Sequence, residues 1–131
     1  DRDALVAERR AVSKLVLAQM RYILQADSRL AQAPHDPIAQ TEQMEAEHDL
    51  TLYDEFAFRA LIRSMKAVFS AVRQATAVYR DAESNWRRSP SATNAQTLQN
   101  CVSVIKGLLA SPLSEPAFVE DLLRFARIPI P

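Results

Sequence analysis

The stretch FRALIRSMKAVFSAVRQATAVYRDAESNW, residues 58–86, decides the fold, because its apolar residues recur at intervals of three and four positions. They form a seam made up of Phe58, Leu61, Met65, Val68, Val72, Ala75, Tyr79, Ala82 and Trp86. Such a seam, sustained over four heptads, is typical of a helix that packs against other helices. Two neighbouring columns widen it, one of Ile62, Phe69 and Thr76 and one of Ala57, Ser64, Ala71 and Val78. A stripe this broad favours the centre of a bundle over a two-stranded coiled coil, and we expect the small second column to admit a closely packed helix.

Glycine and proline, which interrupt helices, are absent from long stretches of the 131-residue chain. Gly107 is the only glycine, and no proline lies within residues 1–33 or 38–89. We therefore predict an all-α fold, a four-helix bundle with an additional short acidic helix, in a single domain over residues 1–131. The expected helices cover about residues 3–32, 37–48, 51–88, 91–110 and 115–127, and an extended tail covers 128–131.

Local signals set the boundaries of the first three helices. Asp36 is placed to cap the second helix, with Pro37 at the first helical position. A single helix over residues 37–88 would be about 78 Å long at about 1.5 Å per residue, which is outside the usual range. We expect a break instead, because Thr51 followed by Asp54 resembles a capping box with aspartate in place of glutamate.

The last two predicted helices carry one apolar face each. The inward face of the first of them is expected to consist of Ala95, Leu98, Val102, Ile105 and Leu109. Cys101, the only cysteine, lies three residues after Leu98 and four before Ile105, which predicts a buried core thiol and no disulfide. In the final helix, Ser114 is the expected cap, and the predicted apolar face consists of Phe118, Leu122 and Phe125.

Charge is balanced overall but unevenly distributed, since 16 basic and 16 acidic residues cancel. Residues 41–55 hold six acids and no base, whereas residues 56–90 hold seven bases against Asp81 and Glu83. Five of these bases, Arg59, Lys66, Arg73, Arg80 and Arg87, recur every seven positions. Within the stripe, Arg63, Lys66 and Arg73 have no acid three or four residues away on the same helix.

We consider three interpretations of this basic stripe, which consists of Arg59, Arg63, Lys66, Arg73, Arg80 and Arg87. It could contact the phosphates of a nucleic acid or another polyanion, without sequence specificity. It could pair, within the chain or between subunits, with an acidic helical face formed by Glu42, Glu45 and Asp49. It could also be an ordinary solvated flank whose long side chains cover apolar surface.

The sequence contains no catalytic or cofactor-binding motif. Glu45 and His48 have the E-x-x-H spacing of di-iron bundles, but such sites need two of these motifs, and the chain has only two histidines. A single glycine excludes a glycine-rich phosphate loop. We therefore predict no catalytic residue, no metal site and no cofactor, and expect the protein not to be an enzyme.

Trp86 is a candidate anchor for a partner, although we favour a position that closes the end of the core. No apolar run is longer than that of residues 15–18, which is far shorter than the roughly 20 residues that span a bilayer, so no transmembrane segment is predicted. The sequence leaves the location of the protein open. It favours a non-enzymatic interaction or assembly module that binds a protein partner or a second copy, with a sequence-independent nucleic-acid binder as the alternative.

Overall fold

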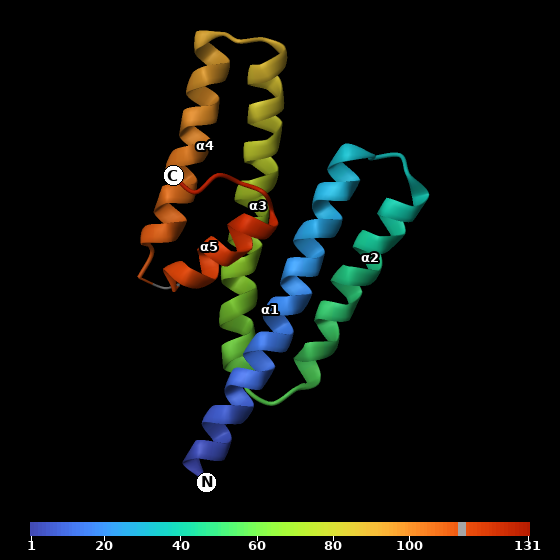
Figure 1. Ribbon diagram of the computed structural model, residues 1–131, viewed down its shortest axis with the longest axis vertical. Helices are drawn as coiled ribbons and strands as arrows, with labels where there is room; N and C mark the ends of the chain where they lie inside the picture. The colour runs from blue at the N-terminus through green and yellow to red at the C-terminus, as the bar shows by residue number, and fades with distance from the viewer. Residues whose placement is uncertain (113–114) are drawn as a thin grey trace. The chain divides into compact units, whose positions relative to one another are not determined.

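The computed structural model describes residues 1–112 and 115–131, and within them the chain is helical, with no strand (Figure 1). Its elements are α1 (Arg2–Gln32), α2 (Pro37–Thr51), the 3₁₀ helix η1 (Leu52–Glu55), α3 (Arg59–Arg88), α4 (Ala92–Ala110) and α5 (Pro116–Phe125). The all-α prediction is confirmed. The chain divides into two compact units, Asp1–Ala67 and Val68–Pro131, which are described in turn. The single-domain organisation stays a prediction.

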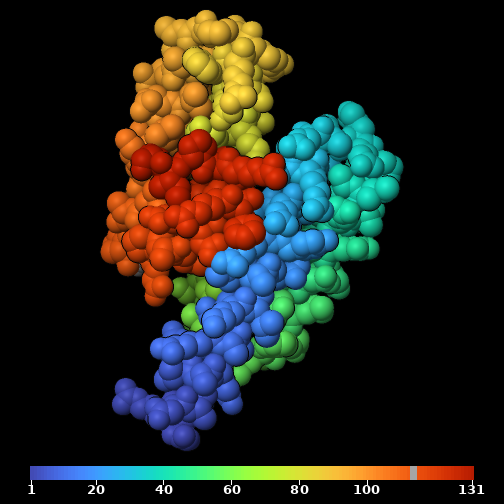
Figure 2. Space-filling model, viewed as in Figure 1, coloured from blue at the N-terminus to red at the C-terminus, as the bar shows by residue number. Residues whose placement is uncertain are grey.

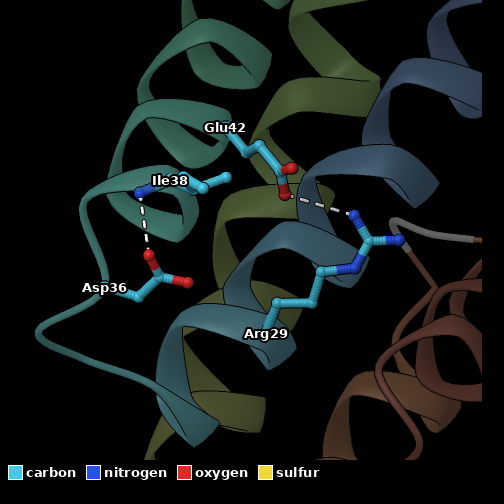
Figure 3. Close-up of polar contacts among 4 residues, drawn as sticks. All are labelled: Arg29, Asp36, Ile38 and Glu42. Carbon is cyan, nitrogen blue, oxygen red and sulfur yellow. Dashed lines mark hydrogen bonds and ion pairs between the residues drawn. The ribbon is translucent and has the colours of Figure 1, made fainter.

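The first unit is built on the antiparallel α1–α2 hairpin. The loop between the helices ends at Asp36, whose carboxylate accepts a hydrogen bond of 3.0 Å from the backbone N–H of Ile38, with Pro37 opening α2 (Figure 3). This confirms the predicted cap. The buried residues of α2 include Ala39 and Ala46, and such small side chains let two helices approach closely.

Two side-chain contacts hold α1 against α2. Gln19 donates a hydrogen bond of 3.0 Å from its amide nitrogen to the carbonyl oxygen of Ala46, and Gln43 donates one of 2.8 Å to the carboxylate of Asp27. Residues 1–11, in contrast, are all exposed. The hairpin therefore involves the later turns of α1, and the first turns extend beyond it, as the dark blue end of the chain shows (Figure 2).

The predicted start of the third helix at Thr51 is wrong. α2 continues through Thr51, whose hydroxyl donates a hydrogen bond of 2.6 Å back to the carbonyl oxygen of His48 instead of capping a new helix. The helical path ends only after η1, and α3 begins at Arg59. The turn is marked by an edge-on contact between the rings of Tyr53 and Phe56, whose centroids are 5.1 Å apart, and by Phe58 in the left-handed region at φ 64°.

The wide apolar stripe of α3 is largely confirmed. The buried side chains are Ile62, Met65, Phe69, Val72, Ala75, Thr76, Tyr79 and Ala82, which belong to the seam and to the column containing Ile62. The seam fails at its C-terminal end, because Trp86 is 39% exposed and does not close the core. The second column is not a buried contact either, since Ala57, Ser64 and Val78 are exposed.

The second unit contains the C-terminal part of α3, α4, α5 and the tail. Ser91 caps α4 by accepting a hydrogen bond of 3.1 Å from the N–H of Asn94, and the amide of Asn94 donates one of 2.8 Å to the carbonyl oxygen of Ser89. Cys101 and Ile105 are buried, which confirms the core thiol, whereas Ala95 is exposed. Leu98, Val102 and Leu109 are half-buried, so the predicted inward face of α4 is confirmed except at Ala95.

The face of α5 also differs from the prediction. Its buried residues are Val119, Leu122 and Leu123, whereas Phe118 and Phe125 are only half-buried. The buried face of α5 is therefore rotated from the predicted one. Val119 and Leu123 lie inward beside Leu122, where the two phenylalanine rings were expected. The helix begins after Glu115 with Pro116 at its first turn, and the proposed cap at position 114 lies outside the described residues.

The C-terminus of α5 closes in a Schellman motif. Arg127 adopts φ 59° and donates its N–H to the carbonyl oxygen of Arg124 at 3.1 Å, while Ile128 donates to that of Leu123 at 3.0 Å. The motif turns the chain back so that Ile128 is buried. The tail is non-helical as predicted, but its first residue belongs to the core.

Candidate interaction surfaces

A groove of about 550 Å³ runs between α3 and α4 in the second unit. From α3 it is lined by Ala71, Gln74, Ala75 and Val78. From α4 it is lined by Thr97, Asn100, Cys101, Val104 and Leu108. Most of this lining is apolar, with neutral polar groups and no charged side chain among the residues named. The groove can therefore take up apolar side chains or an apolar ligand, with amide and hydroxyl groups available for orientation.

The side chains that α3 presents to the groove are mostly small, so they leave space beside α4 unfilled. Ala71, Ala75 and Val78 recur at intervals of four and three, so they form one column along α3. Val78 and, across the groove, Val104 are 51% and 56% exposed. The small residues of the column containing Ala71 and Val78 predict a closely packed helix there, whereas the structure leaves this column open.

The other flank of α3 contacts the C-terminal end of α5. Arg80, two residues beyond Val78 and hence on the far side of the helix, donates a hydrogen bond of 3.2 Å to the carbonyl oxygen of Ala126. The C-terminal segment thus covers one flank of α3, and the groove lies on the opposite flank.

Tyr79 and Cys101 are buried at the contact between α3 and α4. Burial raises the pKa of the Tyr79 hydroxyl, and the nearby carboxylate of Glu83 raises it further through its charge and through a hydrogen bond. Both causes keep the phenol neutral to higher pH. The arrangement describes a structural tyrosine whose proton the fold retains.

At the start of α3, the basic stripe contacts the acidic segment, which we define as residues 41–55, within the first unit. The ammonium group of Lys66 lies 2.5 Å from a carboxylate oxygen of Asp54, twelve residues earlier in the chain. Arg59 and Arg63 are exposed and, with Asp54, line a smaller polar cavity of about 380 Å³. The spacing of Thr51 and Asp54 predicts a capping box instead, and no helical spacing indicates an ion pair between residues twelve positions apart.

Further along α3, two stripe residues also have oxygen acceptors within the second unit. Arg80 bonds to the carbonyl of Ala126, and Arg87 lies 2.8 Å from the carboxylate of Glu83, one turn before it. Arg73 and Arg80 are half-buried. A strict seven-residue repeat drifts by about 20° per heptad on a straight α-helix, so residues at this spacing turn progressively from one side of the helix toward another.

The acidic residues of α2 have different environments. Glu42 accepts an ion pair of 3.2 Å from Arg29 of α1 (Figure 3), whereas Glu45 and Asp49 are exposed. The acidic segment does pair with the stripe inside the chain, but through Asp54 rather than through Glu42. Pairing of Glu45 and Asp49 with a partner stays a prediction, as does the anchor role of Trp86.

Among residues 1–112 and 115–131, no group of three or more histidine, cysteine, aspartate or glutamate side chains could hold a metal ion. None of the helices that the structure describes is long and apolar enough to cross a membrane. Comparisons with protein-family models, with curated proteins and with solved structures give no match. Function must therefore be argued from the surfaces themselves.

Proposed function

We propose that this protein is a non-enzymatic interaction module that binds an apolar or amphipathic helical segment of a partner protein in the groove between α3 and α4. The observation that carries the proposal is the groove itself, about 550 Å³ in volume and lined mainly by apolar side chains. An amphipathic helix docks in such a groove by inserting side chains spaced three and four residues apart.

The chemistry of the lining supports a protein segment over a charged ligand. Gln74, Thr97 and Asn100 supply neutral hydrogen-bonding groups at the groove, and no lining residue carries a charge that would select a phosphate or a carboxylate. The exposed side chains of Val78 and Val104 would gain burial on docking. Burial of apolar surface stabilises a complex by roughly 25 cal/mol per Å², before the entropy of association is subtracted.

The alternative function, sequence-independent binding of a polyanion along α3, gains no support from the contacts of the stripe. Lys66, Arg80 and Arg87 already contact Asp54, the carbonyl of Ala126 and Glu83. A phosphate would have to compete with these acceptors. Steeply salt-dependent binding of DNA or RNA would nevertheless revive the alternative.

Affinity capture with matched variants tests the proposal. Val78→Asp with Val104→Asp places two charges in the groove at exposed positions, so the fold should be retained. Leu5→Asp with Val6→Asp adds the same charge at exposed positions of α1 outside the groove. A genuine partner is retained by the wild type and by the α1 variant but lost by the groove variant. A partner that all three proteins retain equally would contradict docking in the groove.

A further inference from the structure

A polar cavity of about 380 Å³ lies beside the turn between α2 and α3, within the first unit. It is lined by Asp54 of η1 and by Arg59, Ile62 and Arg63 of α3. Its volume falls within the range of about 300–1,000 Å³ that is typical of ligand sites. Three of these four residues carry a charge, so the cavity would recognise a ligand through charge.

The two arginines of the cavity have no partner in the part of the chain that the structure describes. Neither guanidinium takes part in a hydrogen bond or an ion pair there, although Glu55 precedes Arg59 by four residues. Because residues four positions apart are neighbours on one face of a helix, Arg59 and Arg63 bring their charges to the same place. Arginines on a helix surface commonly keep their charged ends in water, but here both side chains line one cavity.

The acidic residue of the cavity does not neutralise these arginines, because Asp54 is bound to Lys66. The carboxylate of Asp54 lies 2.5 Å from the ammonium group of Lys66 and accepts a hydrogen bond from it. These two charges cancel each other. An anion that enters the cavity would therefore meet the two positive charges of Arg59 and Arg63.

We propose that this cavity binds a phosphate group, free or esterified in a small molecule, between the guanidiniums of Arg59 and Arg63. A guanidinium donates two parallel hydrogen bonds to phosphate oxygens. A phosphomonoester carries a charge of roughly −1.5 to −2 at neutral pH, which matches two arginines, whereas a carboxylate carries one charge. The inference goes beyond the proposed function, since it uses one cavity in the first unit and neither the groove nor the length of the basic stripe.

NMR titration of the ¹⁵N-labelled protein with inorganic phosphate tests the proposal. The phosphate concentration is raised from about 0.1 mM to about 10 mM, and sodium chloride keeps the ionic strength constant. We expect saturable shifts of amide signals within residues 54–66. Arg59→Gln with Arg63→Gln should weaken the binding at least about tenfold, because both charge-assisted contacts are lost. Both side chains are exposed, so the fold should be retained.

Arg10→Gln with Lys14→Gln is the matched control. These two cations are also exposed, four residues apart on one helix and without a partner in the described part of the chain, but they do not line the cavity. The control should bind phosphate as the wild type does. Asp54→Asn should strengthen binding severalfold, because it removes a negative charge from the lining and releases Lys66.

A parallel titration with glycerol 3-phosphate distinguishes the two sources of the phosphate group. Tighter binding of the ester than of inorganic phosphate would support an esterified ligand, and the reverse order would support the free ion. No saturable shift with either compound would overturn the proposal. Equal weakening by the cavity variant and the control would overturn it too, because general surface charge would then attract the anion. Failure of the groove is distinguishable, since Val78→Asp with Val104→Asp should leave phosphate binding unchanged.

Discussion

The ammonium group of Lys66 lies 2.5 Å from a carboxylate oxygen of Asp54, and this ion pair ties the end of the acidic segment to the second turn of α3. Asp54 lies within η1 and the left-handed Phe58 lies between the two residues, so the pair closes the turn between α2 and α3. The side chain of Asp54 is more than half exposed, and ion pairs at such positions contribute modestly to stability.

We predict a measurable but small coupling between these two residues. In a double-mutant cycle with Asp54→Asn and Lys66→Met, the coupling free energy of unfolding should be about 0.5–1 kcal/mol at low salt and should shrink as salt is added. Urea denaturation of the four proteins measures it. Purely additive effects at low salt would show that the pair does not stabilise the turn.

Gly107 lowers the stability of α4, because glycine is an unfavourable residue inside a helix. It lies within α4 without a positive φ, and a Cβ added there would meet no atom within 4 Å. Gly107→Ala should therefore stabilise the fold by roughly 0.5–1 kcal/mol, because alanine loses less conformational freedom in a helix. Thermal unfolding followed by circular dichroism gives the answer, and a lower melting temperature would contradict it.

Arg127 is a non-glycine residue at a position where the backbone conformation favours glycine. Its φ of 59° closes the Schellman motif, and a non-glycine residue in this region costs about 1–2 kcal/mol. Arg127→Gly should raise the free energy of unfolding by about 0.5–1 kcal/mol, after the greater flexibility of glycine in the unfolded chain is subtracted. Arg124→Gly is the matched comparison. Because Arg124 lies within α5, where glycine is unfavourable, this substitution should destabilise the protein.

Close packing between α1 and α2 depends on Ala46, which is fully buried and whose carbonyl accepts the Gln19 hydrogen bond. Ala46→Leu should destabilise the protein by about 1–3 kcal/mol, because the larger side chain must separate the helices. Met44→Leu on the exposed side of the same helix should change stability by less than about 0.5 kcal/mol. Equal effects of the two substitutions in urea denaturation would mean that the hairpin is not closely packed at Ala46.

Tyr79 should make stability depend on pH in the alkaline range. Its pKa in the folded protein is raised above 10.0 by burial and by Glu83, so the unfolded state loses the proton first as the pH rises. Unfolding is then increasingly favoured above about pH 10, and the stabilisation is fully present below that pH. Tyr79→Phe should lose less stability than the wild type between about pH 9 and about pH 11. Tyr22→Phe, at an exposed position, should follow the wild type.

Much of the helical architecture could be predicted because it follows from local chemistry. Asp36 and Pro37 start α2 as expected, and the spacing of apolar residues identifies the buried side of α3. The capping box at Thr51 failed because the same hydroxyl can bond backward to the preceding turn, and the sequence does not say which bond forms. The actual break depends on Phe58 adopting a conformation that phenylalanine rarely takes.

The surfaces were harder to predict because they depend on contacts between distant residues. Arg80 bonds to a carbonyl 46 residues later, and Lys66 pairs with an acid twelve residues earlier, whereas helical spacing finds only pairs such as Arg87 with Glu83. The groove depends on how α3 and α4 are rotated against each other, and on α4 Ala95, which was predicted to face inward, is exposed. Small residues alone do not distinguish a close contact from an open groove.

Docking in the groove is tested most directly with the photo-reactive amino acid benzoylphenylalanine. One protein carries it in place of Val104, which lines the groove, and a second carries it in place of Ala95, which is exposed on α4 outside the groove. Each protein is irradiated in an extract of the cells that produce it, and the cross-linked polypeptides are identified by mass spectrometry. If a partner docks in the groove, it should be captured from position 104 and not from position 95. Capture of the same polypeptides from both positions, or of none from position 104, would contradict the proposal that a partner docks between α3 and α4.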